Sequence, residues 1–198
     1  MIADCTFAAI DFESAGAERG KTDVPVQIGM ATWSVASGHA DHFTSFIQTD
    51  RPITWAAQKV HGISCDDLTE APQLMMLWPQ IKRTLSQRVV VAHGHGTEKR
   101  YLRAFPAHGF GPWVDTLLLA RAAWPELPSH ALGDICEHFL LTEKISGLVP
   151  NKTWHDALYD ATASLVLLEH LIDIFNLCKS PIDLLLHPDT KEWHRLRN

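Results

Sequence analysis

A short apolar run near the start of the chain ends abruptly in two carboxylates, and this junction constrains the fold more than any other feature. The run extends from Phe7 to Ile10, and Asp11 and Glu13 follow it. Because alternate residues of a β-strand share a face, Asp11 and Glu13 point the same way. Carboxylates this close repel each other unless a cation lies between them, and such oxygen ligands suit Mg²⁺ or Mn²⁺. Taken alone, the pair could equally open a polar turn after a buried strand.

A third acid follows a second predicted strand. Val89 to Ala92 form a short apolar segment, and the glycines that follow it indicate a turn. Thr97 is the expected N-cap of a helix whose first turn contains Glu98. An acid in the first turn also interacts favourably with the helix dipole, so helix capping alone would explain Glu98.

The last two polar candidates lie at the start of a long amphipathic helix. Apolar residues recur at helical spacing from Leu158 to Phe175, and Asp156 is the expected N-cap. Five residues of regular helix would rotate His155 away from the face of Asp160. Both side chains can therefore reach one site only if His155 lies just before the helix. The alternative is an exposed cap histidine and a surface aspartate.

In this order and spacing, the three segments resemble the DEDDh family of 3′-to-5′ exonucleases, the DnaQ-like group. Further segments match the family in the same order: Val26–Gly29, Val60–Ile63, Asp115–Arg121 and Ser129–Cys136. The resemblance implies an α/β fold of the ribonuclease H-like class, with a central mixed five-stranded sheet flanked by helices. The periodicity predicts strands at about 6–12, 26–35, 41–48, 89–93 and near 113. It predicts helices at about 54–61, 73–87, 98–105, 116–123 and 131–141, followed by the long one that carries Asp160.

The resemblance also implies a function. It predicts a metal-dependent exonuclease that hydrolyses phosphodiester bonds at the 3′ end of single-stranded nucleic acid or short oligonucleotides and releases nucleoside 5′-monophosphates. Two Mg²⁺ or Mn²⁺ ions would stabilise the displacement. By resemblance, the metal ligands would be Asp11, Glu13, Glu98 and Asp160, with Asp11 bridging the two ions.

His155 would be the general base, because histidine side chains titrate near neutral pH. By the same resemblance, the substrate contacts would come from Phe12, Ser14, His61, Gly62 and Ile63, although strand alternation directs the Phe12 side chain to the core.

The second motif departs from the family pattern. The family carries His-Asn-x-x-Phe-Asp, whereas this chain has Gly94 for Asn, Thr97 for Phe and Glu98 for Asp. A carboxylate is retained on a stem one methylene longer, and Mg²⁺ tolerates imperfect octahedra poorly. We expect an active site that works better with Mn²⁺ than with Mg²⁺. The alternative is a catalytically weak or inactive nucleic-acid-binding member of the same fold.

Composition restricts the organisation of the chain. With 198 residues and 46% hydrophobic residues, it can form one exonuclease domain over 1–198, with a core at about 5–178 and a C-terminal extension at 179–198. No stretch is apolar enough to span a membrane and no signal segment opens the chain, so a cytoplasmic location is expected. The four cysteines lack Cys-x-x-Cys spacing, which argues against a zinc ribbon or a disulfide framework.

The net charge of −6 bears on the partners. An acidic surface disfavours extended binding along a nucleic-acid duplex. Bound cations would offset part of the negative charge at the site. The expected partners are the 3′ ends of single-stranded DNA or RNA, with no membrane. A homodimer is compatible with the sequence. No sliding-clamp peptide supports association with a polymerase, although a polymerase-associated proofreading subunit is a further alternative.

Overall fold

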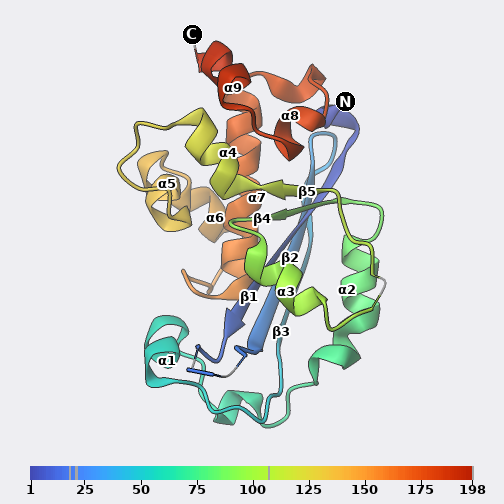
Figure 1. Cartoon of the computed structure of the whole chain (residues 1–198), viewed down its shortest axis with the longest axis vertical. Coiled ribbons are helices and arrows are strands. Elements are labelled where there is room, and N and C mark those ends of the chain that lie inside the picture. Colours follow the sequence, from blue (N-terminus) through green and yellow to red (C-terminus); the bar gives the residue numbers. More distant parts are fainter. Residues whose placement is uncertain (18, 21, 107, 198) are drawn as a thin grey trace.

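A computed structural model describes residues 1–17, 19–20, 22–106 and 108–197. Its centre is a five-stranded sheet in the order β3-β2-β1-β4-β5 (Figure 1). The strands are β1 (Thr6–Ser14), β2 (Pro25–Ser34), β3 (Gly38–Phe46), β4 (Val89–Ala92) and β5 (Trp113–Asp115). β1, β2 and β3 pair antiparallel, whereas β1, β4 and β5 pair parallel. The prediction of a mixed five-stranded sheet is confirmed.

Helices cover both faces of this sheet. The helices of the described residues are α1 (Trp55–His61), α2 (Trp78–Leu85), α3 (Gly96–Leu102), α4 (Thr116–Ala123), α5 (Leu132–His138), α6 (Thr142–Leu148), α7 (Ala157–Ile174), α8 (Asp183–Leu186) and α9 (Thr190–Arg197). Short 3₁₀ helices occupy Ile2–Asp4, Asp66–Leu68, Leu74–Leu77 and Leu177–Lys179. Each described helix falls short of the length and apolarity needed to cross a membrane.

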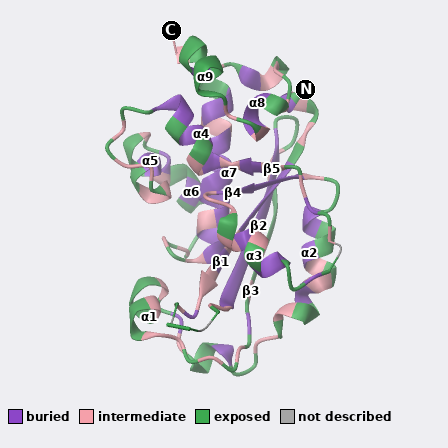
Figure 2. Ribbon diagram, viewed as in Figure 1, coloured by how far each residue is buried: buried purple, intermediate pink, exposed green. Residues whose placement is uncertain are grey.

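Side-chain alternation along β1 divides the core into two layers. Phe7 and Ala9 pack in a cluster with α7, whereas Ala8, Ile10 and Phe12 pack in a second cluster with α2 and α3. Figure 2 shows β2, β4 and much of α7 in the colour of buried residues, whereas β3 is largely exposed. The odd-numbered positions of β1 thus face α7, and Asp11 and Glu13 continue that set beyond the apolar run.

A glycine lets α7 approach the sheet closely. Gly29 of β2 pairs with Asp11 of β1. A Cβ atom at Gly29 would lie 2.1 Å from backbone atoms of Ala157 and Leu158, much closer than real contacts allow. The missing side chain therefore lets the start of α7 cross the sheet beside Asp11.

Several predicted helices are placed differently. α3 begins at Gly96 with His95 as its N-cap, so Thr97 lies inside the helix and its prediction as the N-cap is wrong. The helix expected over 73–87 is a 3₁₀ turn followed by α2, with Pro79 in the first turn of α2. The helix expected over 131–141 ends at His138, and the chain then turns through Leu140 at φ 57° into the separate helix α6.

The C-terminal segment packs on the main body. Leu185 and Trp193 are fully buried and join the same apolar cluster as α7. α9 contacts α4, and α8 contacts β5. The division of the chain into a core and a C-terminal extension stays a prediction.

Candidate active site

Three predicted site residues from distant parts of the chain meet at the carboxyl end of β1. Ligand atoms of Glu13, His155 and Asp160 all lie within 4.8 Å of one another. Glu13 is near the end of β1, and the other two flank the start of α7. The structure therefore brings the first and third motifs together.

The start of α7 is fixed by a polar anchor. Asp156 caps the helix, its Oδ1 accepting a hydrogen bond from Leu158 N at 3.0 Å, and its Oδ2 accepts from Gln27 Nε2 at 3.0 Å. The side-chain Oε1 of Gln27 in turn accepts from Ala157 N at 3.0 Å. Lys152 Nζ also donates to Asp156, at 2.7 Å. The predicted cap is confirmed, and a buried glutamine of β2 ties it to the sheet.

His155 lies just before the helix, as the spacing predicted. Its φ of 67° is in the left-handed region, which residues other than glycine adopt only at a cost. This backbone turn brings the exposed His155 ring to Glu13 and Asp160 despite the five-residue spacing. A regular helix would have separated them.

The remaining acids surround Asp11. Burial raises the pKa of Asp11 well above its usual value, and the charges of Asp160, Glu98 and Glu13 raise it further. Glu98 reaches the site from α3 and is 5% exposed. The charges of the other three predicted carboxylates therefore all act on Asp11. Of the four, Glu13 and Asp160 form the close cluster with His155.

The carboxylate oxygens fit a divalent cation. Asp160 Oδ1 and Glu98 Oε2 are buried and have no hydrogen-bond partner among the described residues. Burial, with Asp160 and Asp156 nearby, raises the pKa of Glu13 to about 8, and burial raises the pKa of Asp160 and of Glu98 to about 7. Buried carboxylates that resist ionisation and keep an oxygen without a donor are what a hard cation would stabilise.

The loop before Glu98 is held by the strand beside it. Gly94 N donates to Asp115 Oδ1 at 3.0 Å. His93 Nε2 donates to the His130 carbonyl at 2.9 Å, and its Nδ1 lies 3.0 Å from Thr116 Oγ1. Both ring nitrogens of His93 thus have hydrogen-bond partners within the protein. These contacts give this histidine of the second motif a structural role that requires no bound metal.

A cleft of about 280 Å³ opens next to His155. Its lining includes the predicted substrate contacts His61, Gly62 and Ile63. His61 Nε2 donates to the Ser14 carbonyl at 3.1 Å, and its Nδ1 accepts from Ile63 N at 3.0 Å. Burial lowers the pKa of His61, in keeping with a neutral ring that donates from one nitrogen and accepts at the other.

Two predicted substrate contacts lie at the end of β1, outside this lining. The Phe12 side chain is buried and makes an edge-to-face contact with Tyr101, with ring centroids 5.3 Å apart. Ser14 is half-buried, and its side chain hydrogen-bonds the Tyr101 hydroxyl.

Sequence reasoning missed three residues that line the cleft: Gln27, Phe46 and Asp67. Gln27 lies in a segment that matched the family, but no local pattern indicates its contact with α7. Phe46 ends β3 and remains 38% exposed. The exposure of such an apolar side chain is decided by distant elements and leaves no local signal.

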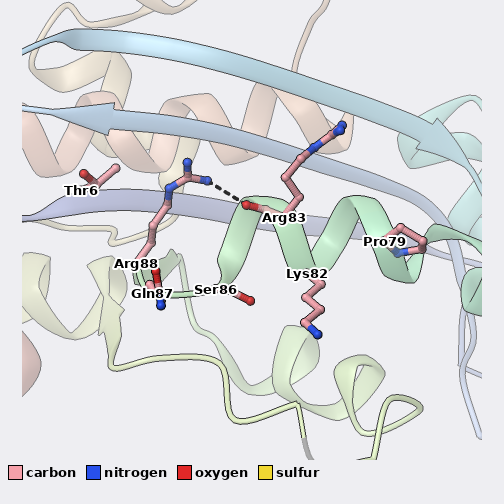
Figure 3. Close-up of a pocket in the computed structure, with 7 residues that line it drawn as sticks. All are labelled: Thr6, Pro79, Lys82, Arg83, Ser86, Gln87 and Arg88. Carbon is pink, nitrogen blue, oxygen red and sulfur yellow. Dashed lines mark hydrogen bonds between the residues drawn. The ribbon is translucent and has the colours of Figure 1, made fainter.

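Another hollow lies away from the acids, between α2 and the start of β1, and has a volume of about 720 Å³. Figure 3 shows its lining, in which Lys82 and Arg83 point away from each other. Arg88 donates to the carbonyl of Arg83 at the end of α2 (Figure 3). It also donates to the carbonyl of Thr84. These basic residues suit a helix C-terminus, whose carbonyls favour cations.

A family model described as Exonuclease matches residues 8–168, a range that includes the predicted site residues Asp11, Glu13, Glu98, His155 and Asp160. The chain belongs to the exonuclease family. Its resemblance to the DEDDh, DnaQ-like group is confirmed, and the chain carries a nuclease domain of a family that implies dependence on a divalent metal.

The chain is similar to proteins whose names refer to DNA polymerase III. It is 27% identical over 180 residues to the PolC-type DNA polymerase III of Bacillus cereus, covering 87% of this chain and 12% of the relative. It is 26% identical over 166 residues to a DNA polymerase III subunit epsilon-like protein of Rhodobacter capsulatus, covering 80% of this chain and 22% of that protein. The chain thus spans only a small part of the length of these relatives.

Solved structures share the fold. Exonuclease X in complex with 5′ overhanging duplex DNA superposes with a TM-score of 0.68 at 24% identity, covering 85% of this chain and 92% of the other. The nuclease domain of 3′hExo, a DEDDh family member bound to rAMP, gives a TM-score of 0.63 at 14% identity, covering 85% and 92%. The ribonuclease H-like exonuclease fold predicted from the sequence is confirmed.

Proposed function

We propose that this exonuclease removes nucleotides one at a time from the 3′ end of single-stranded nucleic acid or short oligonucleotides and releases nucleoside 5′-monophosphates. The observation that carries the proposal is the convergence of Glu13, His155 and Asp160 within 4.8 Å. This arrangement joins carboxylate ligands to a histidine that can accept a proton.

Two Mg²⁺ or Mn²⁺ ions would, when bound, polarise the phosphodiester and lower the pKa of the attacking water. Glu13 and Asp160 would hold one ion, Glu98 would support the other, and Asp11 would bridge them. Their oxygen donors match the preference of such ions. The unpartnered oxygens of Asp160 and Glu98 support this assignment.

The protein side chains would perform the proton transfer and orient the substrate. A ring nitrogen of His155 would take the proton of the attacking water. His61, Gly62 and Ile63 would hold the terminal nucleotide in the adjoining cleft, since they line it together with His155. Ser14 would contact the substrate from the end of β1, and Phe12, whose side chain is buried, would contribute its backbone.

The first test is digestion of 5′-labelled single-stranded DNA and RNA oligonucleotides in Mg²⁺ and in Mn²⁺. We expect a ladder that shortens stepwise from the 3′ end. The Asp11→Ala variant, purified in parallel, controls for contaminating nucleases. Absence of cleavage in every combination would overturn the proposal and favour a nucleic-acid-binding role.

The role of His155 has its own test. We expect His155→Ala to lower the rate by about 10²- to 10⁴-fold, as the loss of a general base does. Mn²⁺ binding, measured by calorimetry, should persist in His155→Ala and fail in Asp11→Ala. Equal loss of Mn²⁺ binding in the two variants would contradict the assigned roles.

The polymerase relatives support a second candidate function, proofreading within a replicative complex. In that case the protein would co-purify with a polymerase and remove a mismatched 3′ terminus faster than a matched one. Equal rates on the two primers, without any co-purifying polymerase, would reject this candidate.

A further inference from the structure

The end of α2 carries three cations that the proposed cleavage chemistry leaves unused. Lys82 and Arg83 are exposed in the last turns of α2, and Arg88 directly precedes β4. Within the part of the chain that the structure describes, none of the three forms an ion pair with a carboxylate. Unpaired cations gathered on a protein of net charge −6 favour an anionic ligand.

Two hollows meet at these side chains. Lys82, Arg83 and Arg88 line the hollow of about 720 Å³ between α2 and the start of β1 (Figure 3). Arg83 and Arg88 also line a hollow of about 330 Å³ on the side of β3, together with Asp41 and His42. Burial lowers the pKa of His42, so the positive charge comes from the lysine and the arginines. These three residues are called the basic surface of α2 below.

The carbonyls at the end of α2 account for only one of the three cations. Arg88 is half-buried and donates to the carbonyls of Arg83 and Thr84. Arg83 instead donates to the neutral side chain of Gln80, and Lys82 points away from Arg83 (Figure 3). The charges of Lys82 and Arg83 are therefore available to a ligand.

The directions of these side chains suit a row of anionic groups better than a single one. Lys82 and Arg83 point away from each other (Figure 3), so each would contact a different phosphate. The phosphates of a stacked nucleic-acid strand recur about every 3.4 Å along its axis. Ser86 and Gln87 add exposed polar side chains to the larger hollow, and hydroxyl and amide groups commonly contact phosphate oxygens.

Strand β3 joins the basic surface of α2 to the cleft beside His155. Phe46, at the end of β3, lines that cleft, whereas His42, four residues earlier, lines the smaller basic hollow. At about 3.3 Å per residue, the two positions lie about 13 Å apart along the strand. β3 is an edge strand whose side chains are half-buried or exposed. The same length corresponds to about four stacked nucleotides.

We propose that the basic surface of α2 binds the phosphate backbone of the nucleic-acid strand, upstream of the nucleotide that is removed. The proposal rests on the proposed exonuclease function, which puts the 3′ end in the cleft beside His155. A strand longer than about four nucleotides reaches both places, whereas a shorter one reaches only the cleft. The protein should therefore bind long strands more tightly than short oligonucleotides.

The test compares the wild type with the double variant Lys82→Gln/Arg83→Gln. Fluorescein-labelled thymidine oligonucleotides, a trinucleotide and a strand of about 20 nucleotides, are bound in Ca²⁺ over a series of salt concentrations. Anisotropy gives Kd. Lys191→Gln/Arg195→Gln is the matched control, since it removes two exposed cations from α9 and changes the net charge equally.

The salt dependence measures the phosphate contacts directly. For the long strand, the loss of two contacts should reduce the slope of log Kd against log salt by about 1.4, because each contact with a single strand contributes about 0.7. This change amounts to about 25-fold weaker binding at 0.1 M salt relative to 1 M. Binding of the trinucleotide should not change.

Two further proteins separate a local charge effect from a structural one. Lys82→Arg/Arg83→Lys retains both charges and should bind the long strand like the wild type, and so should the α9 control. An unchanged slope in Lys82→Gln/Arg83→Gln, an equal loss for the trinucleotide or an equal loss in the α9 control would overturn the proposal.

An acidic protein partner is the competing occupant of a basic surface. A polyglutamate peptide of about 20 residues is therefore added as a competitor to the long strand. Unlabelled strand should displace the labelled strand at lower concentrations than the peptide does. More effective displacement by the peptide would reject a nucleic-acid backbone as the ligand.

Failure of the exonuclease function would be recognised separately, because these binding measurements need no turnover. Loss of long-strand binding in Lys82→Gln/Arg83→Gln, without any cleavage by the wild type, would still support backbone binding at α2. Cleavage from the 3′ end, with equal binding of the long strand by the two proteins, would reject the basic surface and retain the exonuclease.

Discussion

The two helices that bring acids to the site begin very differently. α7 starts with a side-chain cap at Asp156, which Gln27 and Lys152 hold in place. α3 starts at an N-cap, His95, whose side chain makes no capping hydrogen bond within the described part of the chain, and Glu98 in its first turn keeps an unpartnered oxygen. Side chains therefore preorganise the start of α7, whereas the start of α3 lacks a capping side chain, and each helix presents one acid with an unpartnered oxygen.

The largest expected effect contrasts the two acids that these helices carry. Asp160→Asn should lower the rate of cleavage by about 10³-fold or more, because metal stabilisation of the transition state is worth several kcal/mol. Glu98→Gln should lower the rate by a factor about ten times smaller, since Glu98 lies outside the close cluster of Glu13, His155 and Asp160. Single-turnover rates in Mn²⁺ measure both. Equal losses of rate in the two variants would show that Asp160 and Glu98 contribute equally to cleavage.

The anchor of α7 can be broken without touching an acid. Gln27→Leu leaves the Ala157 N–H buried without its partner, at a cost of about 1–3 kcal/mol. The melting temperature should fall by about 2–12 °C. The rate should fall as well, because His155 and Asp160 flank the loosened end. Gln58→Leu, on the exposed surface of α1, is the matched control. An unaltered melting temperature would show that the anchor is dispensable.

The acids themselves should make the metal-free protein less stable as pH rises. Burial raises the pKa of Glu13 to about 8 from an ordinary 4.5. Between these values the folded state retains a proton that the unfolded state releases, so a rise in pH favours unfolding. Glu13→Gln should therefore melt higher than the wild type, with a difference that grows from pH 5 to pH 8.

Added Mn²⁺ should reverse this loss in the wild type, with a larger rise in melting temperature at pH 8 than at pH 5.5. Calorimetric scans at both pH values measure it. A difference between Glu13→Gln and the wild type that stays constant across this range would contradict the pKa shift.

The smallest expected effect concerns the choice of ion. The wild type should turn over faster in Mn²⁺ than in Mg²⁺, because the longer stem of Glu98 imposes an imperfect geometry that Mg²⁺ tolerates poorly. Glu98→Asp should shift the ratio of the two rates toward Mg²⁺ by a few fold. Initial rates in each ion provide the measurement. Equal or faster turnover of the wild type in Mg²⁺ would reject this explanation.

Local patterns in the sequence predicted much of the fold and of the cluster. Alternation along β1 placed Asp11 and Glu13 on one face, and the charge of Asp160 raises the pKa of both. The spacing of His155 and Asp160 correctly required a break before α7. The prediction failed at Thr97, because several neighbouring residues can begin a helix and the choice depends on packing.

The sequence by itself predicted which residues would carry the chemistry and determined their order along the chain, because strand alternation, helix periodicity and capping act between near neighbours. Only the tertiary structure decided three contacts. Gln27 hydrogen-bonds the start of α7, the missing side chain of Gly29 lets α7 approach the sheet, and Phe46 lines the cleft. These contacts join residues far apart along the chain, such as Gln27 and Asp156, which are separated by 129 positions. Their geometry depends on how whole elements pack, and local periodicity carries no information about it.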